Sequence, residues 1–462
     1  MNKVSGRVCG LVLGDNAQRT GELALGRSSR RAFGLSAAIL VAAVLAGCTV
    51  APERPGVPDP GPSVDVPEKV VPFRVPALAS LPDSAPRALA GRYVEVAWGN
   101  LPGWQADDLK DFWANFVRNC RGLMRPTSNS LTRAPFANPR AWQPVCAAAL
   151  DPSKAPRADN APAIRQFLQA YLMPWQIETP QRKIAESIAT GYYEPLVKGS
   201  RVRGGVYQWP LFAVPQDLLT IDLASLHPEL AGKRIRGKIA GDRVVPYDSR
   251  TELNNPNRQP PAIVWVDDPV DNFFLQIQGS GRVLLAQGPN AGQTIRLAYA
   301  NHNGHPYVSI GRWLADKGEI PLAQTSMQNI RAWAKRNPAR VQEMLNVNPA
   351  VVFFREETIA DPNEGPKGAY SIPLGARRSI AVDPSFVPLG TPVFLSTTMP
   401  SSNTPLNRFV FAQDTGTAIR GAARADFYWG SGDEAGALAG RMKQRSQMWL
   451  LWPKAAGAPS AR

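Results

Sequence analysis

Three aspartates near the C-terminus have the side chains best suited to acid–base chemistry. Asp414 and Asp426 lie in the Gly- and Ala-rich stretch AQDTGTAIRGAARADFYWGSG, and Asp383 precedes a proline in SIAVDPSFVPLGTPVFL. Each follows a β-prone run or a turn with glycines nearby, so the backbone there can turn tightly and approach a ligand closely. Taken singly, each aspartate is sufficiently explained as a turn former or a cap. Together, they predict a site built on carboxylates.

Asp426 is the better candidate for the acid of such a site. The three residues after it are aromatic: Phe427, Tyr428 and Trp429. Their apolar bulk would raise the pKa of the Asp426 carboxyl and keep it protonated near neutral pH. We expect Asp414 to support Asp426 with a charge or a hydrogen bond.

These aspartates belong to a set of strands that follows a change in sequence texture. After residue 190, short β-prone runs such as NFFLQIQGSGRVLL alternate with Gly, Pro and Asn, which predicts a β-rich region at 193–356. That region contains one helical segment at 326–345, interrupted at Pro338. Further strands are predicted in VFFRE, RRSIAVDP, GTPVFL and NRFVFAQD, followed by a helix at 435–444 and a last strand in MWLLWP.

Two helices are predicted ahead of the β-rich region. Apolar residues recur at helical spacing over 104–120 and over 161–171. Asp107 and Asp108 suit the positive N-terminal end of the first helix. The fold class is therefore mainly β with peripheral helices (α+β), and no internal repeat suggests a solenoid.

Several motifs resemble those of a known family and occur in the same order. Residues 370–453, with their Asp-Pro, Gln-Asp-Thr-Gly and Arg-Ala-Asp segments, look like the three-aspartate (3D) domain of the membrane-bound lytic murein transglycosylase A (MltA) family. Further landmark segments are TGYYEP, QIQGSGR, YANHNGHPYVSIGR and VFFRE. The resemblance covers about residues 100–455.

This resemblance implies an architecture. The family combines a double-psi-type β-barrel, built from N- and C-terminal parts of the chain, with an inserted β-rich domain, and the glycan lies in the groove between them. The changes of texture near 190 and 357 fit such an insertion. We expect the barrel domain at 86–192 and 357–455 and the inserted domain at 193–356.

The resemblance also implies a reaction. The family cleaves the β-1,4 bond between N-acetylmuramic acid and N-acetylglucosamine in peptidoglycan without water and leaves a 1,6-anhydromuramoyl end, which is carbon–oxygen lyase chemistry on a polysaccharide. Asp426 would protonate the leaving oxygen and then accept a proton from the sugar's own 6-hydroxyl. Two alternatives stay open: a two-carboxylate hydrolase with Asp414 as base or nucleophile, and a non-catalytic peptidoglycan-binding lipoprotein.

The landmark segments contain the residues that we expect to bind the glycan. These residues are Thr190, Tyr192, Gln278, Gly279, Ser280 and Asp383. The Gln-Gly-Ser-Gly run would form a polar loop that reaches a hydroxyl or acetamide group, and Tyr192 and Tyr193 would offer stacking faces. Asp383 is interpreted as more structural than catalytic, because Asp-Pro before a Val-Pro-Leu-Gly turn has a local explanation.

No metal or cofactor is expected. His302 and His305 in HNGH invite a zinc interpretation, but the chain has only 3 histidines. The cysteines that could complete a tetrahedral zinc site are expected to be paired with each other. A contact with sugar or a structural turn is the simpler explanation of the HNGH segment.

The N-terminus resembles that of a bacterial lipoprotein precursor. Basic residues lead into about fifteen apolar or small residues that end in LAGC, which predicts a signal peptide at 1–47 and a lipid on Cys48. An ordinary cleaved signal or a short anchor helix is the alternative. The Pro-rich segment at 48–85 would form an extended tether, and Thr49 favours sorting to the outer membrane. We expect the protein on the periplasmic face of a Gram-negative outer membrane.

Charge and cysteine usage agree with an exported protein. Loss of six basic and two acidic residues with the signal peptide lowers the formal net charge from +15 to +11, which favours an anionic cell-wall polymer. Export argues against nucleic acid. We expect a monomer whose partners are glycan strands, the outer membrane and cell-wall synthesis or hydrolase complexes. Cys120 and Cys146 are expected to form a disulfide, with two reduced buried thiols as the alternative.

Overall fold

The computed structural model describes residues 73–82, 85–125, 134–223, 225–227, 230, 235–288 and 290–461. The predicted signal peptide, Cys48 and most of the predicted tether therefore lie outside the described residues. Across the described ranges, no helix has both the length and the apolar character that crossing a bilayer requires.

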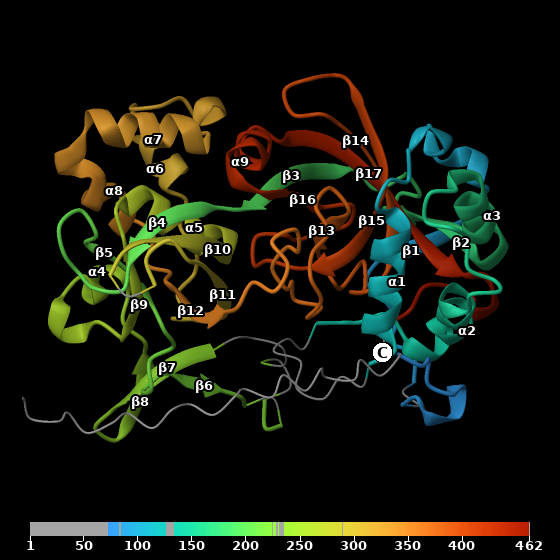
Figure 1. The fold of residues 1–462 in the computed structure, drawn as a ribbon, viewed down its shortest axis with the longest axis horizontal. Coiled ribbons are helices and arrows are strands. Elements are labelled where there is room, and N and C mark those ends of the chain that lie inside the picture. Colours follow the sequence, from blue (N-terminus) through green and yellow to red (C-terminus); the bar gives the residue numbers. More distant parts are fainter. Residues whose placement is uncertain are drawn as a thin grey trace, which may run out of the picture. The chain divides into compact units, whose positions relative to one another are not determined.

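The largest sheet has eight strands, drawn from early and late parts of the described chain (Figure 1). Its strand order is β1-β2-β17-β14-β15-β13-β16-β3. The strands are β1 (Arg92–Glu95), β2 (Leu172–Glu178), β3 (Ser187–Glu194), β13 (Ser379–Val382), β14 (Pro392–Thr398), β15 (Pro405–Asp414), β16 (Ala425–Ser431) and β17 (Lys443–Pro453). Strand β16 runs parallel to β3 and antiparallel to β13, and β17 pairs with β2, β14 and β3.

A six-stranded sheet is formed by residues between β3 and β13. Its order is β12-β11-β10-β4-β9-β5. The strands are β4 (Leu196–Ser200), β5 (Trp209–Phe212), β9 (Ala262–Val266), β10 (Ser280–Gln287), β11 (Thr294–His302) and β12 (Val352–Glu357). Only Pro195 separates β3 from β4, so the chain leaves the eight-stranded sheet and enters the six-stranded one within one residue.

The same part of the chain contributes a small sheet and several helices. The three-stranded sheet consists of β6 (Leu219–Ile221), β7 (Ile235–Ala240) and β8 (Arg243–Pro246). The helices are α4 (Arg250–Leu253), α5 (Pro269–Gln278), α6 (Ile310–Asp316), α7 (Met327–Arg336) and α8 (Val341–Asn346). Buried residues of α5 to α8 form a core of their own around Trp333.

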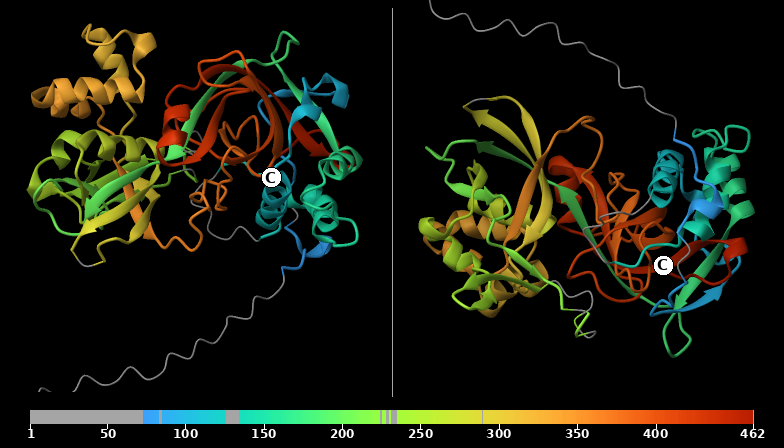
Figure 2. Two further views of the ribbon diagram at one scale, coloured as in Figure 1. Left: turned by 45° about the horizontal axis from the view of Figure 1, so that its top comes forward. Right: turned by 90° about the horizontal axis from the view of Figure 1, so that it is seen from below.

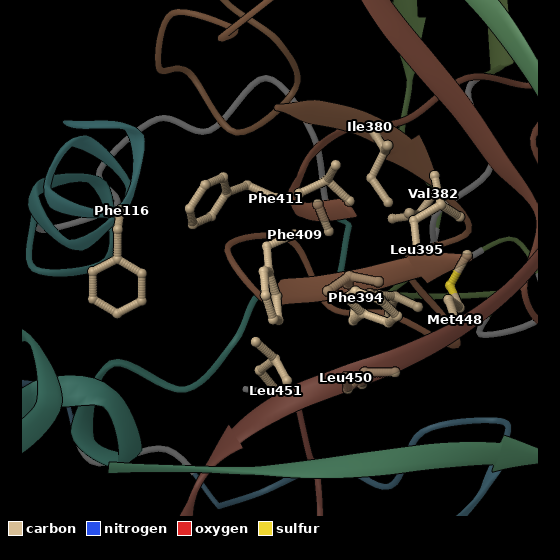
Figure 3. Packing of buried hydrophobic residues seen from close by; sticks show 14 of the residues in the cluster. Phe116, Ile380, Val382, Phe394, Leu395, Phe409, Phe411, Met448, Leu450 and Leu451 are labelled. Carbon is tan, nitrogen blue, oxygen red and sulfur yellow. The ribbon is translucent and has the colours of Figure 1, made fainter. Parts of the chain in front are cut away.

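The core of the eight-stranded sheet is rich in aromatic side chains. Figure 3 shows Phe394, Phe409, Phe411, Leu450 and Leu451 packed between the strands, with Phe116 facing them from a helix. Phe409 and Phe411 are two positions apart on β15 and therefore point to the same face of the strand. The ring of Phe112 stacks on Phe411 with 5.2 Å between centroids. This packing fixes the middle of β15, up to three residues before Asp414.

Three helices lie beside this sheet, on the side away from the six-stranded sheet (Figure 2). They are α1 (Phe112–Leu123), α2 (Pro139–Leu150) and α3 (Ala161–Tyr171). A disulfide joins Cys120 of α1 to Cys146 of α2, the pair expected from the sequence, with 5.3 Å between the Cα atoms. A fourth helix, α9 (Gly432–Ala439), packs on β3 and β16.

The coarse predictions from the sequence are confirmed. The chain is mostly β with some helices, and α3 has the bounds that its periodicity predicts. The interruption at Pro338 is also present, because α7 ends before it and α8 begins after it. The predicted helix at 435–444 is α9, but it begins and ends earlier, and residues 443–444 already belong to β17.

Two predictions of local structure are wrong. The helix predicted at 104–120 begins only at Phe112, because Asp107 is buried in an ion pair with Arg378 rather than placed at a helix N-terminus. The run NFFLQIQ, predicted as a strand, lies in α5. Asp268 caps that helix by accepting from two backbone N–H groups, and Pro269 occupies its first turn. These start signals outweigh the β propensity of the aromatic residues that follow.

Candidate active site

Asp426 lies on β16 between two partner strands. Its residue partners are Ala381 on β13 and Thr190 on β3. The Thr190 hydroxyl donates a hydrogen bond of 2.7 Å to Oδ1 of Asp426 and so links two positions 236 residues apart. The flanking residues Ala425 and Phe427 are fully buried, whereas Asp426 itself is partly exposed. The site therefore presents one carboxyl from an otherwise buried strand.

The surroundings of Asp426 favour its neutral form. Desolvation by the protein raises the pKa of the Asp426 carboxyl from 3.8 to about 6, although the Thr190 hydrogen bond and the positive charge of Arg424 oppose the change. The negative charge of Asp414 adds to the increase. A carboxyl with this pKa is a suitable general acid near neutral pH. The direction of this pKa change is the one expected from the sequence.

Arg424 also belongs to the site, although it was not identified as a functional residue from the sequence. Its Nη2 donates to Thr190 Oγ1 at 2.9 Å, and its Nη1 donates to the carbonyl of Ile188 at 2.9 Å and to that of Ala425. Desolvation lowers the pKa of the Arg424 guanidinium, and the charge of Asp426 opposes that change. The Arg-Ala-Asp motif, which places Arg424 two residues before Asp426 in the turn that enters β16, was the available signal.

Asp414 lies at the end of β15 and accepts hydrogen bonds from at least three donors. Its Oδ1 accepts from the backbone N–H groups of Ala369 and Thr415, both at 2.9 Å, and its Oδ2 accepts from the Tyr192 hydroxyl at 3.2 Å. These bonds tie β15 to β3 and to the segment before β13. Asp414 is therefore a fixed negative charge close to Asp426 rather than a carboxylate with unoccupied oxygens.

The tyrosines of the TGYYEP segment differ from the expectation that they stack on sugar. Tyr192 is 9% exposed and lies against Tyr428, with 5.2 Å between ring centroids. Tyr193 is 5% exposed, and its hydroxyl meets the sulfur of Met327 at 3.6 Å. The ring of Tyr192 packs beside Tyr428, its register partner on β16, whereas Tyr193 lies on the other face of β3, under α7 and α9. The stacking interpretation is therefore wrong, and Tyr192 instead contacts Asp414.

Asp383 organises the loop that joins the other two aspartates. Its Oδ1 accepts from the backbone and hydroxyl of Ser385, at 3.1 and 2.6 Å, and its Oδ2 accepts from the backbone N–H of Gly421 at 2.8 Å. Gly421 has a φ of 104°, which favours glycine at this turn. This geometry agrees with the structural role expected for Asp383, because the side chain supports the loop that leads to Arg424.

The Gln-Gly-Ser loop lies at the junction of the two larger sheets. Gln278 is the last residue of α5, Gly279 ends the helix with a φ of 81°, and Ser280 begins β10. The side-chain oxygen of Gln278 accepts from the backbone N–H of Tyr193 at 3.1 Å. The loop is therefore tied to β3 three residues beyond Thr190, while Gly279 and Ser280 stay partly exposed.

A buried ionic cluster, also missed from the sequence, fixes the end of β3. Glu194 is fully buried and accepts from Arg296 at 2.6 Å and from Arg282 at 2.8 Å. Both arginines also donate to the carbonyl of Glu364. Glu194 and Arg282 fall in landmark segments, but Arg296 is 102 residues from Glu194, and no local pattern indicates their pairing.

The described residues include no group of three or more His, Cys, Asp or Glu arranged to hold a metal ion. His305 Nε2 lies 2.7 Å from the carbonyl of Tyr247, and His302 Nδ1 accepts from the backbone N–H of Gly304 at 3.0 Å. These contacts place the HNGH segment in a hydrogen-bonded turn.

Comparison with known families gives two matches that together span most of the described chain. The model of the MltA specific insert domain matches residues 188–355, and that of the 3D domain matches residues 378–452. The first match coincides with β3 to β12, and the second with β13 to β17. The aspartates Asp383, Asp414 and Asp426 all lie within the 3D match.

Relatives and solved structures agree with these matches. Membrane-bound lytic murein transglycosylase A of Escherichia coli (strain K12) is 32% identical over 294 residues, which cover 62% of this chain and 71% of that protein. The lytic transglycosylase LtgG of Burkholderia pseudomallei is 43% identical, covers 81% of this chain and 99% of that one, and has a TM-score of 0.53. MltA from Neisseria gonorrhoeae in a monoclinic form is 35% identical, covers 83% of this chain and 99% of that one, and has a TM-score of 0.66. E. coli MltA with bound chitohexaose is 26% identical, covers 80% of this chain and 99% of that one, and has a TM-score of 0.56. The chain therefore belongs to the family of membrane-bound lytic murein transglycosylase A.

Proposed function

We propose that the protein is a lytic transglycosylase that cleaves the β-1,4 bond between N-acetylmuramic acid and N-acetylglucosamine in peptidoglycan. Family membership supports the substrate class, and the relative with bound chitohexaose supports a glycan-binding site. The observation that carries the reaction is the partly exposed Asp426 carboxyl, whose pKa is raised to about 6. Such a group can donate a proton at neutral pH and accept one afterwards.

One carboxyl is sufficient for this reaction. Asp426 donates its proton to the glycosidic oxygen while the bond from that oxygen to the anomeric carbon breaks and positive charge develops on the sugar. The 6-hydroxyl of the same muramic residue attacks the anomeric carbon and returns its proton to Asp426. The product is a 1,6-anhydro end, no water is consumed, and Asp426 is again protonated for the next cycle.

Asp414 acts in this scheme as an electrostatic support. Its hydrogen-bond donors fix its position and leave it poorly suited to activate water. Its negative charge stabilises the neutral form of Asp426 and the developing positive charge on the sugar. The alternative, a hydrolase that uses Asp414 as base or nucleophile, would give a reducing muramic end that is one water heavier. Mass spectrometry of the products separates the two reactions.

We also propose that the glycan binds where the two larger sheets meet. The domains would be a double-psi-type barrel from 86–192 and 357–455 and an inserted domain from 193–356. The pairing of β17 with both β14 and β3 supports the barrel, and the passage from β3 to β4 at Pro195 supports the boundary. Thr190 at Asp426 and the partly exposed Gly279 and Ser280 would line opposite parts of the binding groove.

The N-terminal segment supports a location at the outer membrane. A lipid on Cys48 would anchor the protein there, and the Pro-rich tether would carry the catalytic part toward the peptidoglycan layer. The relatives named membrane-bound fit such an anchor. Metabolic labelling with a palmitate analogue, lost in Cys48→Ala, tests it.

The decisive experiment measures anhydromuropeptides released from purified sacculi by the wild type and by Asp426→Asn. Because the amide cannot donate and accept the proton, activity should fall on the order of 10³-fold or more. Asp159→Asn, at an exposed ion pair with Arg157, is the matched control and should retain activity. Substantial activity in a folded Asp426→Asn protein would refute the role of Asp426, and reducing ends in the wild-type products would refute the transglycosylase reaction.

A further inference from the structure

The Thr190 hydroxyl lies between a guanidinium and the proposed acid. Arg424 Nη2 is 2.9 Å from Thr190 Oγ1, and that oxygen is 2.7 Å from Oδ1 of Asp426. The three side chains come from β3, from β16 and from the turn just before β16, so the pairing of β3 with β16 assembles them. The arrangement is a continuous chain of two hydrogen bonds.

The direction of this chain is determined by its first member. A guanidinium has only N–H donors and cannot accept a hydrogen bond. The Thr190 hydroxyl must therefore use a lone pair toward Arg424, and its single hydrogen points to Oδ1 of Asp426. The remaining Nη1 of Arg424 donates to the carbonyls of Ile188 and Ala425, which holds the guanidinium in place.

The two oxygens of Asp426 are consequently different. Oδ1 already receives a hydrogen from Thr190, so a proton on that oxygen would face another hydrogen. Within the described ranges, Oδ2 receives no hydrogen bond. We propose that Arg424 is a positioning residue, which orients the Thr190 hydroxyl toward Oδ1 and so places the transferable proton of Asp426 on Oδ2. This inference rests on the proposed role of Asp426 as the acid.

Other charged groups near Asp426 do not supply this orientation. Asp414 on β15 is an acceptor, and the hydroxyl of Tyr192 on β3 is directed to Asp414. Lys443 on β17 lies opposite Thr190 in the strand register but is exposed. Arg424 is thus the cation bonded to Thr190, and its charge also stabilises the ionised form of Asp426.

The first test removes the guanidinium in Arg424→Met, which keeps an apolar stem. Loss of the positive charge should raise the pKa of Asp426, so the alkaline limb of the kcat/KM profile on solubilised glycan strands should move to higher pH. When the proton of Asp426 is no longer held on Oδ2, kcat should fall roughly tenfold, even at low pH where Asp426 is fully protonated. Arg424→Lys should keep the alkaline limb near its wild-type position, and Arg312→Met, an exposed arginine on α6, should leave both quantities unchanged.

The second test asks whether Arg424 acts through Thr190. Thr190→Val removes the hydroxyl at similar volume and should lower kcat, and Thr190→Ser should restore it. Once the hydroxyl is absent, Arg424→Met should lower kcat little further, so the double variant should resemble Thr190→Val. Losses that multiply in the double variant, or an Arg424→Met profile with wild-type kcat and pH dependence, would overturn the proposal.

The outcomes separate this inference from the proposed function. If Asp426→Asn is inactive while Arg424→Met behaves as wild type, the positioning role fails and the transglycosylase role stands. If Asp426→Asn retains activity, the role of Asp426 fails and the positioning role fails with it. Circular dichroism of every variant identifies any protein that has lost its fold.

Discussion

Asp107, which accepts a hydrogen bond from β15, and Asp426, which lies on β16, have opposite surroundings. Asp107 is 5% exposed and accepts from Arg378 at 2.7 and 3.0 Å and from the backbone of Phe409 at 2.9 Å. Among the described residues, Asp426 receives one hydrogen bond, from Thr190, and Arg424 is hydrogen-bonded to that hydroxyl rather than to the carboxylate. The first carboxylate is completely paired, whereas the second has an oxygen left for substrate.

This difference reflects two roles, because the Asp107 ion pair stabilises the fold whereas Asp426 is the proposed acid. Arg378 is 1% exposed and also donates to the carbonyls of Lys110 and Phe409, so its ion pair joins the segment before α1 to β15. A buried ion pair of this kind is costly to break, because the remaining charge has no solvent. An acid that must exchange protons cannot be paired in this way. The protein therefore leaves Asp426 poorly solvated and incompletely bonded.

The largest effect on stability is expected from Asp107→Ala. The substitution removes the buried partner of the Arg378 guanidinium and leaves it the exposed carboxylate of Asp108, which should lower the free energy of unfolding by about 3–5 kcal/mol. The urea midpoint, followed by tryptophan fluorescence, measures the change. The matched control is Asp159→Ala at an exposed ion pair, which should keep the wild-type midpoint. Equal midpoints for Asp107→Ala and the wild type would show that the ion pair between Asp107 and Arg378 does not stabilise the fold.

The disulfide between α1 and α2 should have the second largest effect. Cys120 and Cys146 are 26 positions apart in the chain, and loss of the cross-link should lower the free energy of unfolding by about 3 kcal/mol. The double variant Cys120→Ser/Cys146→Ser should unfold at lower urea, and wild type in reductant should shift similarly. Glycan-cleaving activity in the absence of urea should persist, because both cysteines lie on α1 and α2, away from β3 and β16. Loss of activity in the folded double variant would contradict this separation.

The sequence predicts the parts of the fold that depend on local patterns. Helix α3 and the break at Pro338 follow from apolar periodicity and from the properties of proline. Asp414 and Asp426 are only 12 positions apart in a segment of distinctive composition, so both could be named before their geometry was known. The aromatic residues after Asp426 also predicted the direction of its pKa change.

Pairings across long stretches of sequence could not be predicted. Asp107 and Arg378 are 271 positions apart, and Asp107 instead suggested a helix cap. Thr190 was assigned to the site through its segment, but its bond to Asp426, 236 positions away, depends on the parallel register of β3 and β16. The burial of Tyr192 and Tyr193 has the same origin. These features depend on which strands pair with each other, and the sequence of one strand does not indicate its partner.

The smallest effect is a gain of stability in Asp426→Asn, opposite in sign to that of Asp107→Ala. The pKa of Asp426 is about 6 in the folded protein and about 3.8 in an unfolded chain, so ionisation destabilises the fold as pH rises through this window. Above about pH 7 the cost is complete, at about 3 kcal/mol, and a neutral amide that still accepts from Thr190 recovers part of it. At pH 7.5, Asp426→Asn should therefore have a higher urea midpoint than the wild type. Below about pH 3, where the wild-type carboxyl is protonated in both states, the two midpoints should coincide. A difference that persists unchanged at pH 3 would mean that the amide stabilises the site through new contacts rather than by removing a poorly solvated charge.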